Sequence, residues 1–541
     1  MTTGAALLAR ALAAAGARRL FTLSGNQVMP LYDHLVDAGV ELLHTRHEAA
    51  AVHMADAHAR LGEQPCPVLL TAGPGHANAL GALYVAAMAE SPVVLLSGHA
   101  ELANAGLGAF QEIDQAGLAR RVAKAAWVAR DPGRLGDDLA RAFRLASSGR
   151  PGPVSLSLPA DVLRASAEGA TAPPGAAFRP RRRRPSPSEL DRLRALIAGA
   201  ARPLLLAGPA MARGAAWRAL RRVAEAMGVP ALPVESPRGP NDPALGAVRT
   251  VFARADLVVL FGRRTDFSLG FGRRPLFAEN VRFHDVGPAP RAVAEALLDG
   301  APRCGDAGWR AEVEAARGRG REGWAELERS DARPIHPLRL VAAARRLLGP
   351  EDVFVSDGGE FGQWAQAAGA SPSALETAPP ALETAPSGRE TAPPWHDAAP
   401  ARVINGPSGA IGAALPFAIG ARLARPAARV VAFSGDGAVG YHIAELATAV
   451  RAEVPFVLIV GNDGQWNAEV VIQRGLSDRA LDCLRLGPVR YDRVAEALGA
   501  HGELVEDPAD LDAALARAAS AGRPALVNVL TAPAPAPTLH A

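Results

Sequence analysis

The sequence predicts an α/β protein built from three doubly wound parallel-sheet domains. Short apolar runs that end in Gly, Ser or Pro alternate with longer Ala-rich stretches, and this alternation favours parallel sheets covered by helices on both faces. The chain has 541 residues, enough for about three or four domains. Apolar residues make up 49% and charged residues 21%, so the composition is that of a globular protein and excludes global disorder.

The expected strands form three groups. An Arg/Pro-rich segment at 166–188 separates the first two groups and predicts an interdomain linker, and 531–541 is expected to be a tail. The four-arginine run of the linker is interpreted as solvated rather than phosphate-binding, because no aromatic residues interleave with it. The expected strands are 20–23, 68–70, 93–96 and 154–158 in the first domain (1–165), 204–206 and 257–262 in the central domain (189–325), and 353–355, 430–433, 457–460 and 526–529 in the third domain (335–530).

A tandem repeat of seven residues, three copies long, interrupts the third domain at 374–394. Each copy contains proline, which blocks a continuous helix and so excludes a coiled coil. We expect 371–398 to be a disordered surface insertion.

The charged and sulfur-containing residues exclude several classes of function. The formal net charge is +3, which argues against a dedicated nucleic-acid binder. Lys124 is the only lysine, so the sequence cannot contain a P-loop. The three cysteines are far apart, which indicates neither a zinc site nor a disulfide framework.

No apolar run reaches about 18 residues and the N-terminus is typical of a helix rather than a signal peptide, so we expect no membrane partner and a cytoplasmic location.

Two consecutive strands of the third domain are followed by residue types that bind metal ions. Gly435-Asp436-Gly437 comes directly after one strand, and Asn462 follows the next. The carboxyl ends of parallel strands meet at one crevice, where ligands bind in such folds. A carboxylate at Asp436, the side-chain oxygen of Asn462 and a backbone carbonyl, for which Gly464 is the candidate, form an oxygen set that suits Mg²⁺. The glycines let the backbone approach a diphosphate, and the following helix N-terminus favours its charge; the alternative is two ordinary strand-end turns.

Two further segments place distinctive residues at helix starts. Arg46-His47-Glu48 opens an Ala-rich helix, so Glu48 is either a functional acid or a solvated carboxylate of the kind that helix N-termini favour. A Gly-rich turn at 405–412 also runs into an Ala-rich helix. Its glycine spacing does not fit the dinucleotide-binding fingerprint, and close helix packing is the alternative explanation.

The chain carries five motifs in order: Arg46-His47-Glu48-Ala49-Ala50, Thr71-Ala72-Gly73-Pro74-Gly75, Ala109-Phe110-Gln111-Glu112, Gly409-Ala410-Ile411-Gly412, and Gly435-Asp436-Gly437 paired with Asn462. With these motifs the chain resembles thiamine diphosphate-dependent enzymes of the acetolactate synthase and 2-hydroxyacyl-CoA lyase group. The resemblance spans nearly the whole chain and implies that the three domains are, in order, pyrimidine-binding, central and diphosphate-binding.

The resemblance implies a role for each matching residue. Glu48 would hydrogen-bond N1′ of the aminopyrimidine as the catalytic acid, and Gln111 would point towards the reacting carbon from the first domain of an adjoining subunit. Gly409 would accept from the 4′-amino group, and Ile411 would enforce a bent cofactor. The implied cofactor-binding set is Pro74, Asn78, Gly359, Gly409, Ile411, Gly435, Gly437 and Ala438, and the implied Mg²⁺ ligands are Asp436, Asn462 and Gly464.

The resemblance also implies an activity: a thiamine diphosphate- and Mg²⁺-dependent carbon–carbon lyase or carboligase that acts on a 2-keto acid such as pyruvate, through an ylide at C2 and an enamine. A flavin-free 2-hydroxyacyl-CoA lyase and a non-catalytic cofactor-binding homologue stay open as alternatives. The Gly-Met-His-Gly stretch of flavin-binding acetolactate synthases is absent, so FAD is not expected. The family further implies a homodimer or homotetramer with sites at the dimer interface.

Several further positions bear on the substrate, and some of them depart from the family pattern. Asn26 and Gln27 either hydrogen-bond a polar substrate or cap the next helix, and Trp466 either lines the substrate pocket or packs in the core. Glu360 stands near the expected diphosphate site, where relatives often carry glutamine, so we expect its carboxylate to point away. A group of arginines either grips the phosphates of CoA or belongs to an Arg-rich surface: Arg263, Arg264, Arg273 and Arg274.

Overall fold

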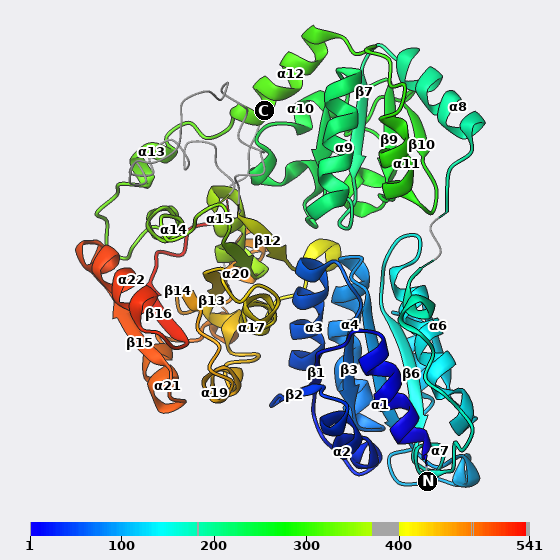
Figure 1. Ribbon diagram of the computed structural model, residues 1–541. Helices are drawn as coiled ribbons and strands as arrows, with labels where there is room; N and C mark the ends of the chain where they lie inside the picture. Colours follow the sequence, from blue (N-terminus) through cyan, green and yellow to red (C-terminus); the bar gives the residue numbers. More distant parts are fainter. Residues whose placement is uncertain (1, 181–182, 370–399, 478, 480, 537–541) are drawn as a thin grey trace, which may run out of the picture. The chain divides into compact units, whose positions relative to one another are not determined.

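The computed structural model describes residues 2–180, 183–369, 400–477, 479 and 481–536 (Figure 1). It contains three sheets whose strand pairs are all parallel, with helices between successive strands. The predicted α/β class with three parallel-sheet domains is therefore confirmed. The predicted insertion at 371–398 and the last five residues of the predicted tail lie outside the described residues.

The first sheet has the order β2-β1-β3-β4-β6-β5. Its inner strands β3, β4 and β6 are buried along their whole length, as expected for strands that helices cover on both faces. Its strands are β1 (Arg19–Thr22), β2 (Glu41–His44), β3 (Cys66–Leu70), β4 (Val93–His99), β5 (Ala125–Val128) and β6 (Val154–Pro159); its helices are α1 (Gly4–Ala14), α2 (Met29–Asp37), α3 (Glu48–Gly62), α4 (Pro74–Met88), α5 (Gln115–Ala119), α6 (Leu135–Ser147) and α7 (Ala160–Arg164).

The second sheet is smaller and has the order β10-β9-β7-β8. Ser186 and Glu189 form a reciprocal capping box that starts α8 at the end of the predicted linker. The strands are β7 (Pro203–Ala207), β8 (Ala231–Pro233), β9 (Leu257–Phe261) and β10 (Arg282–Asp285); the helices of this stretch are α8 (Pro187–Ala198), α9 (Gly214–Met227), α10 (Arg249–Phe252), α11 (Pro290–Leu297), α12 (Ala307–Gly318) and α13 (Trp324–Leu327).

The third sheet, β12-β11-β13-β14-β16-β15, repeats the strand order of the first. In both sheets the order reverses between the first and third strands in sequence, and this switch point is where parallel α/β sheets bind ligands. The strands are β11 (Val353–Ser356), β12 (Ala401–Ile404), β13 (Val430–Gly435), β14 (Val457–Asn462), β15 (His501–Val505) and β16 (Ala525–Leu530); the helices are α14 (Pro337–Arg345), α15 (Gly359–Gly369), α17 (Ala414–Ala424), α18 (Asp436–Val439), α19 (Glu445–Arg451), α20 (Asn467–Leu476), α21 (Tyr491–Ala497) and α22 (Leu511–Ser520).

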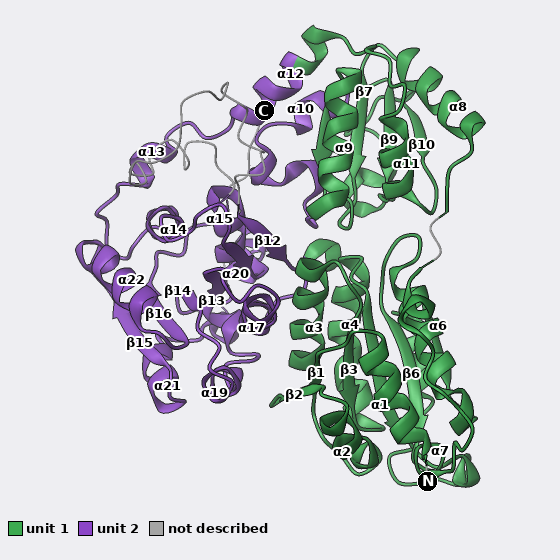
Figure 2. Ribbon diagram, in the orientation of Figure 1, with its two compact units in different colours: residues 1–235, 254–310, 406–408 green, residues 236–253, 311–405, 409–541 purple. Residues whose placement is uncertain are grey.

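The chain forms two compact units (Figure 2). Unit 1 comprises 1–235, 254–310 and 406–408, and unit 2 comprises 236–253, 311–405 and 409–541. Unit 1 therefore holds the first and second sheets, and unit 2 holds the third. The predicted central stretch is divided between the units, because parts of it pack with the residues of unit 2.

Candidate active site

The sequence-predicted site residues lie in two sets, each in the loops and helix starts that follow the first four strands of one sheet. We call them the unit 1 half-site and the unit 2 half-site. In the unit 1 half-site, Asn26 and Gln27 follow β1, Glu48 follows β2, Pro74 and Asn78 follow β3, and Gln111 follows β4.

The unit 2 half-site is arranged in the same way. Gly359 follows β11, and Gly409 and Ile411 follow β12. The residues that end β13 or follow it are Gly435, Asp436, Gly437 and Ala438, and those that end β14 or follow it are Asn462, Gly464 and Trp466.

Glu48 is the first residue of α3 and its side chain is buried, with 9% of the residue exposed. His47 caps the helix by accepting from the Ala49 backbone N–H. Asn78 donates its amide to Glu48 Oε2 at 3.1 Å, which orients the carboxylate. A Cβ on Gly75 would lie 2.5 Å from Thr71 Cγ2 and 3.3 Å from Glu48 Oε1. Glycine at this position therefore lets the backbone pass close to both side chains. Glu48 is thus an oriented, buried acid and not a solvated carboxylate.

Gln27 and Gln111 are joined by a hydrogen bond. Thr71 Oγ1 donates to Gln27 Oε1 at 2.8 Å, and Gln27 Nε2 donates to Gln111 Oε1 at 3.0 Å. Val28 is the N-cap of α2, and within the described residues no side chain caps that helix, so the alternative capping role for Asn26 and Gln27 is wrong. Gln27 is buried and positions Gln111, whereas Asn26 is exposed.

The motifs did not indicate His76, a buried histidine of α4 that lies between Pro74 and Asn78 in the sequence. His76 is fully buried on α4, and its Nδ1 lies 2.8 Å from Ser97 Oγ. Burial lowers the pKa of His76 to about 4, so the ring is neutral at pH 7. Gln115 accepts from the Gly73 backbone N–H and donates to Ser157, which ties the loop after β3 to β6.

The unit 2 half-site is organised around Asp357, a fully buried carboxylate at the end of β11. Asp357 accepts backbone N–H bonds from Gly358, Gly412, Ala413 and Ala414, and it accepts from the Ser434 hydroxyl at 3.0 Å. Burial raises the pKa of Asp357, and these donors oppose the rise. One carboxylate therefore fixes the start of α17 and the end of β13, the two segments that carry the predicted cofactor loops.

Asp436 and Asn462 have the chemistry of cation ligands. Asp436 is buried and accepts from the backbone N–H groups of Gly437 and Gly464, each at 2.9 Å. Asn462 is 2% exposed, and its buried Oδ1 has no hydrogen-bond partner among the described residues. A buried oxygen without a donor is costly unless a cation or water meets it. These two residues therefore fit a divalent cation.

The carbonyl of Gly464, the expected third ligand, is already used. It accepts from the backbone N–H groups of Leu486 and Gly487, so hydrogen bonds occupy both lone pairs, and the Gly464 N–H is turned to Asp436.

Burial raises the pKa of Asp436 to about 6 and that of the adjacent Asp463 to about 7. Within the described residues no group of three or more His, Cys, Asp or Glu side chains could hold a metal. A cation here would depend on one carboxylate with amide or backbone oxygens.

Glycines give the unit 2 half-site its close backbone approaches. A Cβ on Gly437 would lie 2.6 Å from the ring of Trp466, so the indole lies against the Gly-Asp-Gly turn. Gly409 has φ +69° and Gly359 has φ +78°, a left-handed conformation that favours glycine. A Cβ on Gly358 would lie 2.6 Å from the Ala410 carbonyl, which packs the loops after β11 and β12 together.

Two further expectations can be compared with the structure. The Glu360 carboxylate accepts from the Ala536 backbone N–H and is thus engaged by the C-terminal segment. Arg263 is 3% exposed and is bound by Asp266 and Ser268, so it is not available to a CoA phosphate, whereas Arg264, Arg273 and Arg274 are exposed.

None of the helices in the described residues is long and apolar enough to cross a membrane.

The chain is similar to known proteins over nearly its full length. The family models "Thiamine pyrophosphate enzyme, N-terminal TPP binding domain" and "Thiamine pyrophosphate enzyme, C-terminal TPP binding domain" match residues 2–118 and 390–529. A probable acetolactate synthase from Mycobacterium bovis is 33% identical over 97% of this chain and 95% of its own length. A 2-hydroxyacyl-CoA lyase from Oryza sativa subsp. japonica is 28% identical over 98% and 95%, and the human 2-hydroxyacyl-CoA lyase 2 is 29% identical over 92% and 84%.

Proposed function

We propose a reaction from one premise: the chain belongs to the thiamine diphosphate-dependent enzyme family. The proposed activity is Mg²⁺-dependent formation or cleavage of carbon–carbon bonds with a 2-keto acid such as pyruvate as donor, as in an acetolactate synthase. Its main support is the 33% identity, over nearly the whole length, to a protein named probable acetolactate synthase. The second candidate is flavin-free cleavage of a 2-hydroxyacyl-CoA, which relatives of that name at 28% and 29% identity support.

The unit 1 half-site would bind the aminopyrimidine of the cofactor. When bound, thiamine diphosphate supplies an electron sink for a bond that forms or breaks beside a carbonyl. Glu48 would hold a proton at the ring nitrogen N1′, because its carboxylate is buried and Asn78 fixes its orientation. Pro74 and Asn78 would flank the ring, and Gln111, oriented by Gln27, would contact the substrate.

The unit 2 half-site would bind the diphosphate and the cation. Asp436 and Asn462 would be the protein's Mg²⁺ ligands, with the Gly464 carbonyl a weaker candidate because two N–H groups already occupy it. Trp466 would line the substrate pocket beside the Gly-Asp-Gly turn. The remaining cofactor contacts would come from Gly359, Gly409, Ile411, Gly435, Gly437 and Ala438.

The deciding measurement is CO₂ release from pyruvate by the purified protein with thiamine diphosphate and Mg²⁺. We expect release that stops when the cofactor is omitted, with acetolactate as product. No release from pyruvate, together with cofactor-dependent cleavage of a 2-hydroxyacyl-CoA, would establish the second candidate. We expect Glu48→Gln to fold normally and lose nearly all turnover; near-normal activity in that variant would refute the role of Glu48.

We also propose that a complete site combines residues of two subunits in a homodimer or homotetramer. Glu48→Gln and Asp436→Ala should each be inactive. Co-refolded or co-expressed together, they should regain activity, because a mixed dimer would contain one site with both native residues. Failure to regain activity, with mixed dimers shown to form, would mean that each site is built from one subunit.

A further inference from the structure

The candidate metal ligand Asn462 is held by polar residues behind it. Asn462 ends β14, and Asn528 lies on the neighbouring strand β16, where it is paired with Val460. Residues 460 and 462 share one face of the sheet, so Asn528 and Asn462 are diagonal neighbours on that face. Asn528 is fully buried.

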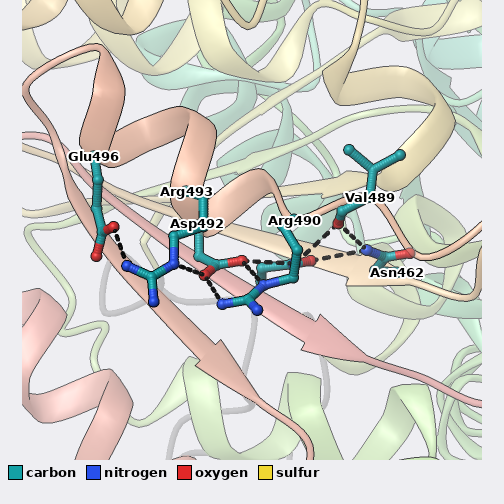
Figure 3. Close-up of polar contacts among 7 residues, drawn as sticks. Asn462, Val489, Arg490, Asp492, Arg493 and Glu496 are labelled. Carbon is teal, nitrogen blue, oxygen red and sulfur yellow. Dashed lines mark hydrogen bonds and ion pairs between the residues drawn. The ribbon is translucent and has the colours of Figure 1, made fainter.

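Both hydrogens of the Asn462 amide are used. Its Nδ2 donates to Asn528 Oδ1 at 3.0 Å. It also donates to the Val489 carbonyl at 3.0 Å (Figure 3). Because nitrogen faces both acceptors, Oδ1 is the atom turned the other way, and it is the buried oxygen without a partner among the described residues. An amide rotated by 180° would lose both bonds and turn its N–H groups towards the proposed cation.

Asn528 is oriented in turn by a charged residue. Its Nδ2 donates to Asp492 Oδ1 at 3.3 Å and to the Val489 carbonyl at 3.2 Å. Arg490 donates to both oxygens of Asp492, at 2.9 and 2.6 Å, and holds that carboxylate in place (Figure 3). The carboxylate accepts from Asn528, whose oxygen accepts from Asn462, so the dipoles align and strengthen one another.

We infer that Asn528 and Asp492 are positioning residues for the cation. They fix the Asn462 amide so that Oδ1 faces the cation, and they make that oxygen a stronger metal ligand. This inference rests on the proposed function, since it takes Asn462 as a cation ligand. Residues that orient metal ligands typically contribute a factor of about 10–100 to metal affinity. Tyr491, whose hydroxyl donates to the Asp436 carbonyl at 2.7 Å, shows that the same segment also supports the other proposed ligand.

The test measures Mn²⁺ binding by electron paramagnetic resonance, with the full-length protein and thiamine diphosphate. Asn528→Leu keeps the volume and removes the polar atoms, and we expect its Mn²⁺ dissociation constant to rise about 10–100-fold. Asp492→Asn, a milder change, should raise it a few-fold. Glu496→Ala is the control, because it breaks only the exposed pair with Arg493 at the outer end of the network; its Mn²⁺ affinity should match wild type.

The melting temperature without metal or cofactor separates positioning from general damage. Loss of Mn²⁺ affinity in Asp492→Asn, with a melting temperature like that of Glu496→Ala, supports the inference even if Asn528→Leu fails to fold. Wild-type affinity in a folded Asn528→Leu, or in Asp492→Asn when the leucine variant does not fold, overturns it. Absence of Mn²⁺ binding by the wild-type protein would refute the proposed cation site itself, and this inference with it.

Discussion

Gly437→Ala tests whether the Gly-Asp-Gly turn and Trp466 form one packed unit. A Cβ on Gly437 would lie 2.6, 2.8 and 2.9 Å from three atoms of the Trp466 ring. Carbon atoms pack at about 3.5–4.0 Å, so the indole or the turn must move by about 1 Å. A displacement of that size in a reacting geometry costs roughly 100-fold in rate. We therefore expect kcat/KM to fall by about 10–100-fold.

The assay is steady-state turnover of whichever substrate the protein uses, at saturating thiamine diphosphate and Mg²⁺. Gly440→Ala is the matched control: Gly440 has φ −57°, and a Cβ there would lie 3.6 Å from the Gly437 carbonyl, an ordinary contact. In a Trp466→Ala background the Gly437→Ala effect should shrink, because the colliding ring is gone. A Gly437→Ala enzyme within threefold of wild type, or an equal effect in both backgrounds, would refute the reasoning.

Three further predictions concern buried polar groups. Asp357→Asn turns an N–H towards the Ala414 and Ser434 donors, and we expect a lower melting temperature and weaker thiamine diphosphate binding by calorimetry. Because His76 has a pKa of about 4 when folded and about 6.5 when unfolded, protonation favours the unfolded chain, so its contribution to stability falls by about 2 kcal/mol from pH 7 to pH 5; His76→Gln should flatten that decline in denaturant titrations. Glu90→Gln weakens a buried acceptor for Arg150, and the melting temperature should fall by several degrees.

The strands that the sequence predicted are the inner strands of all three sheets, and every strand that it missed lies at a sheet edge. Inner strands such as β9 are apolar runs buried on both faces, and such a run is visible in one sequence. Edge strands are short and partly exposed: β10, Arg-Phe-His-Asp, has no fully buried residue. Their pairing comes from the neighbouring strand, and no local pattern marks it. The missed strands are β2, β5, β8, β10, β12 and β15.

The sequence also indicated segments for the proposed site. The motifs after β3, β4, β13 and β14 follow strands that it predicted, whereas the motifs after β2 and β12 follow strands that it missed. It did not indicate how those loops are held. The Gly464 carbonyl looked available from spacing alone, and only the fold brings Leu486 and Gly487 to it. Arg263 looked exposed among other arginines, yet Asp266 folds back to neutralise it. A local motif specifies which polar atoms are present. Whether those atoms are still available to bind a ligand depends on contacts that form across the fold.

The first and third sheets have the same strand order, and this order explains which strand holds the loops of the proposed site in place. In both sheets the sixth strand pairs with the fourth, so it lies next to the strand whose following loop carries part of the proposed site. In the first sheet Ser157 on β6 accepts from Gln115, which holds the loop after β3. In the third sheet Asn528 on β16 holds Asn462 at the end of β14. A buried polar residue inside an inner strand is therefore the signal to seek: Asn528 interrupts the apolar run of β16, and Ser157 is one of two buried serines in β6.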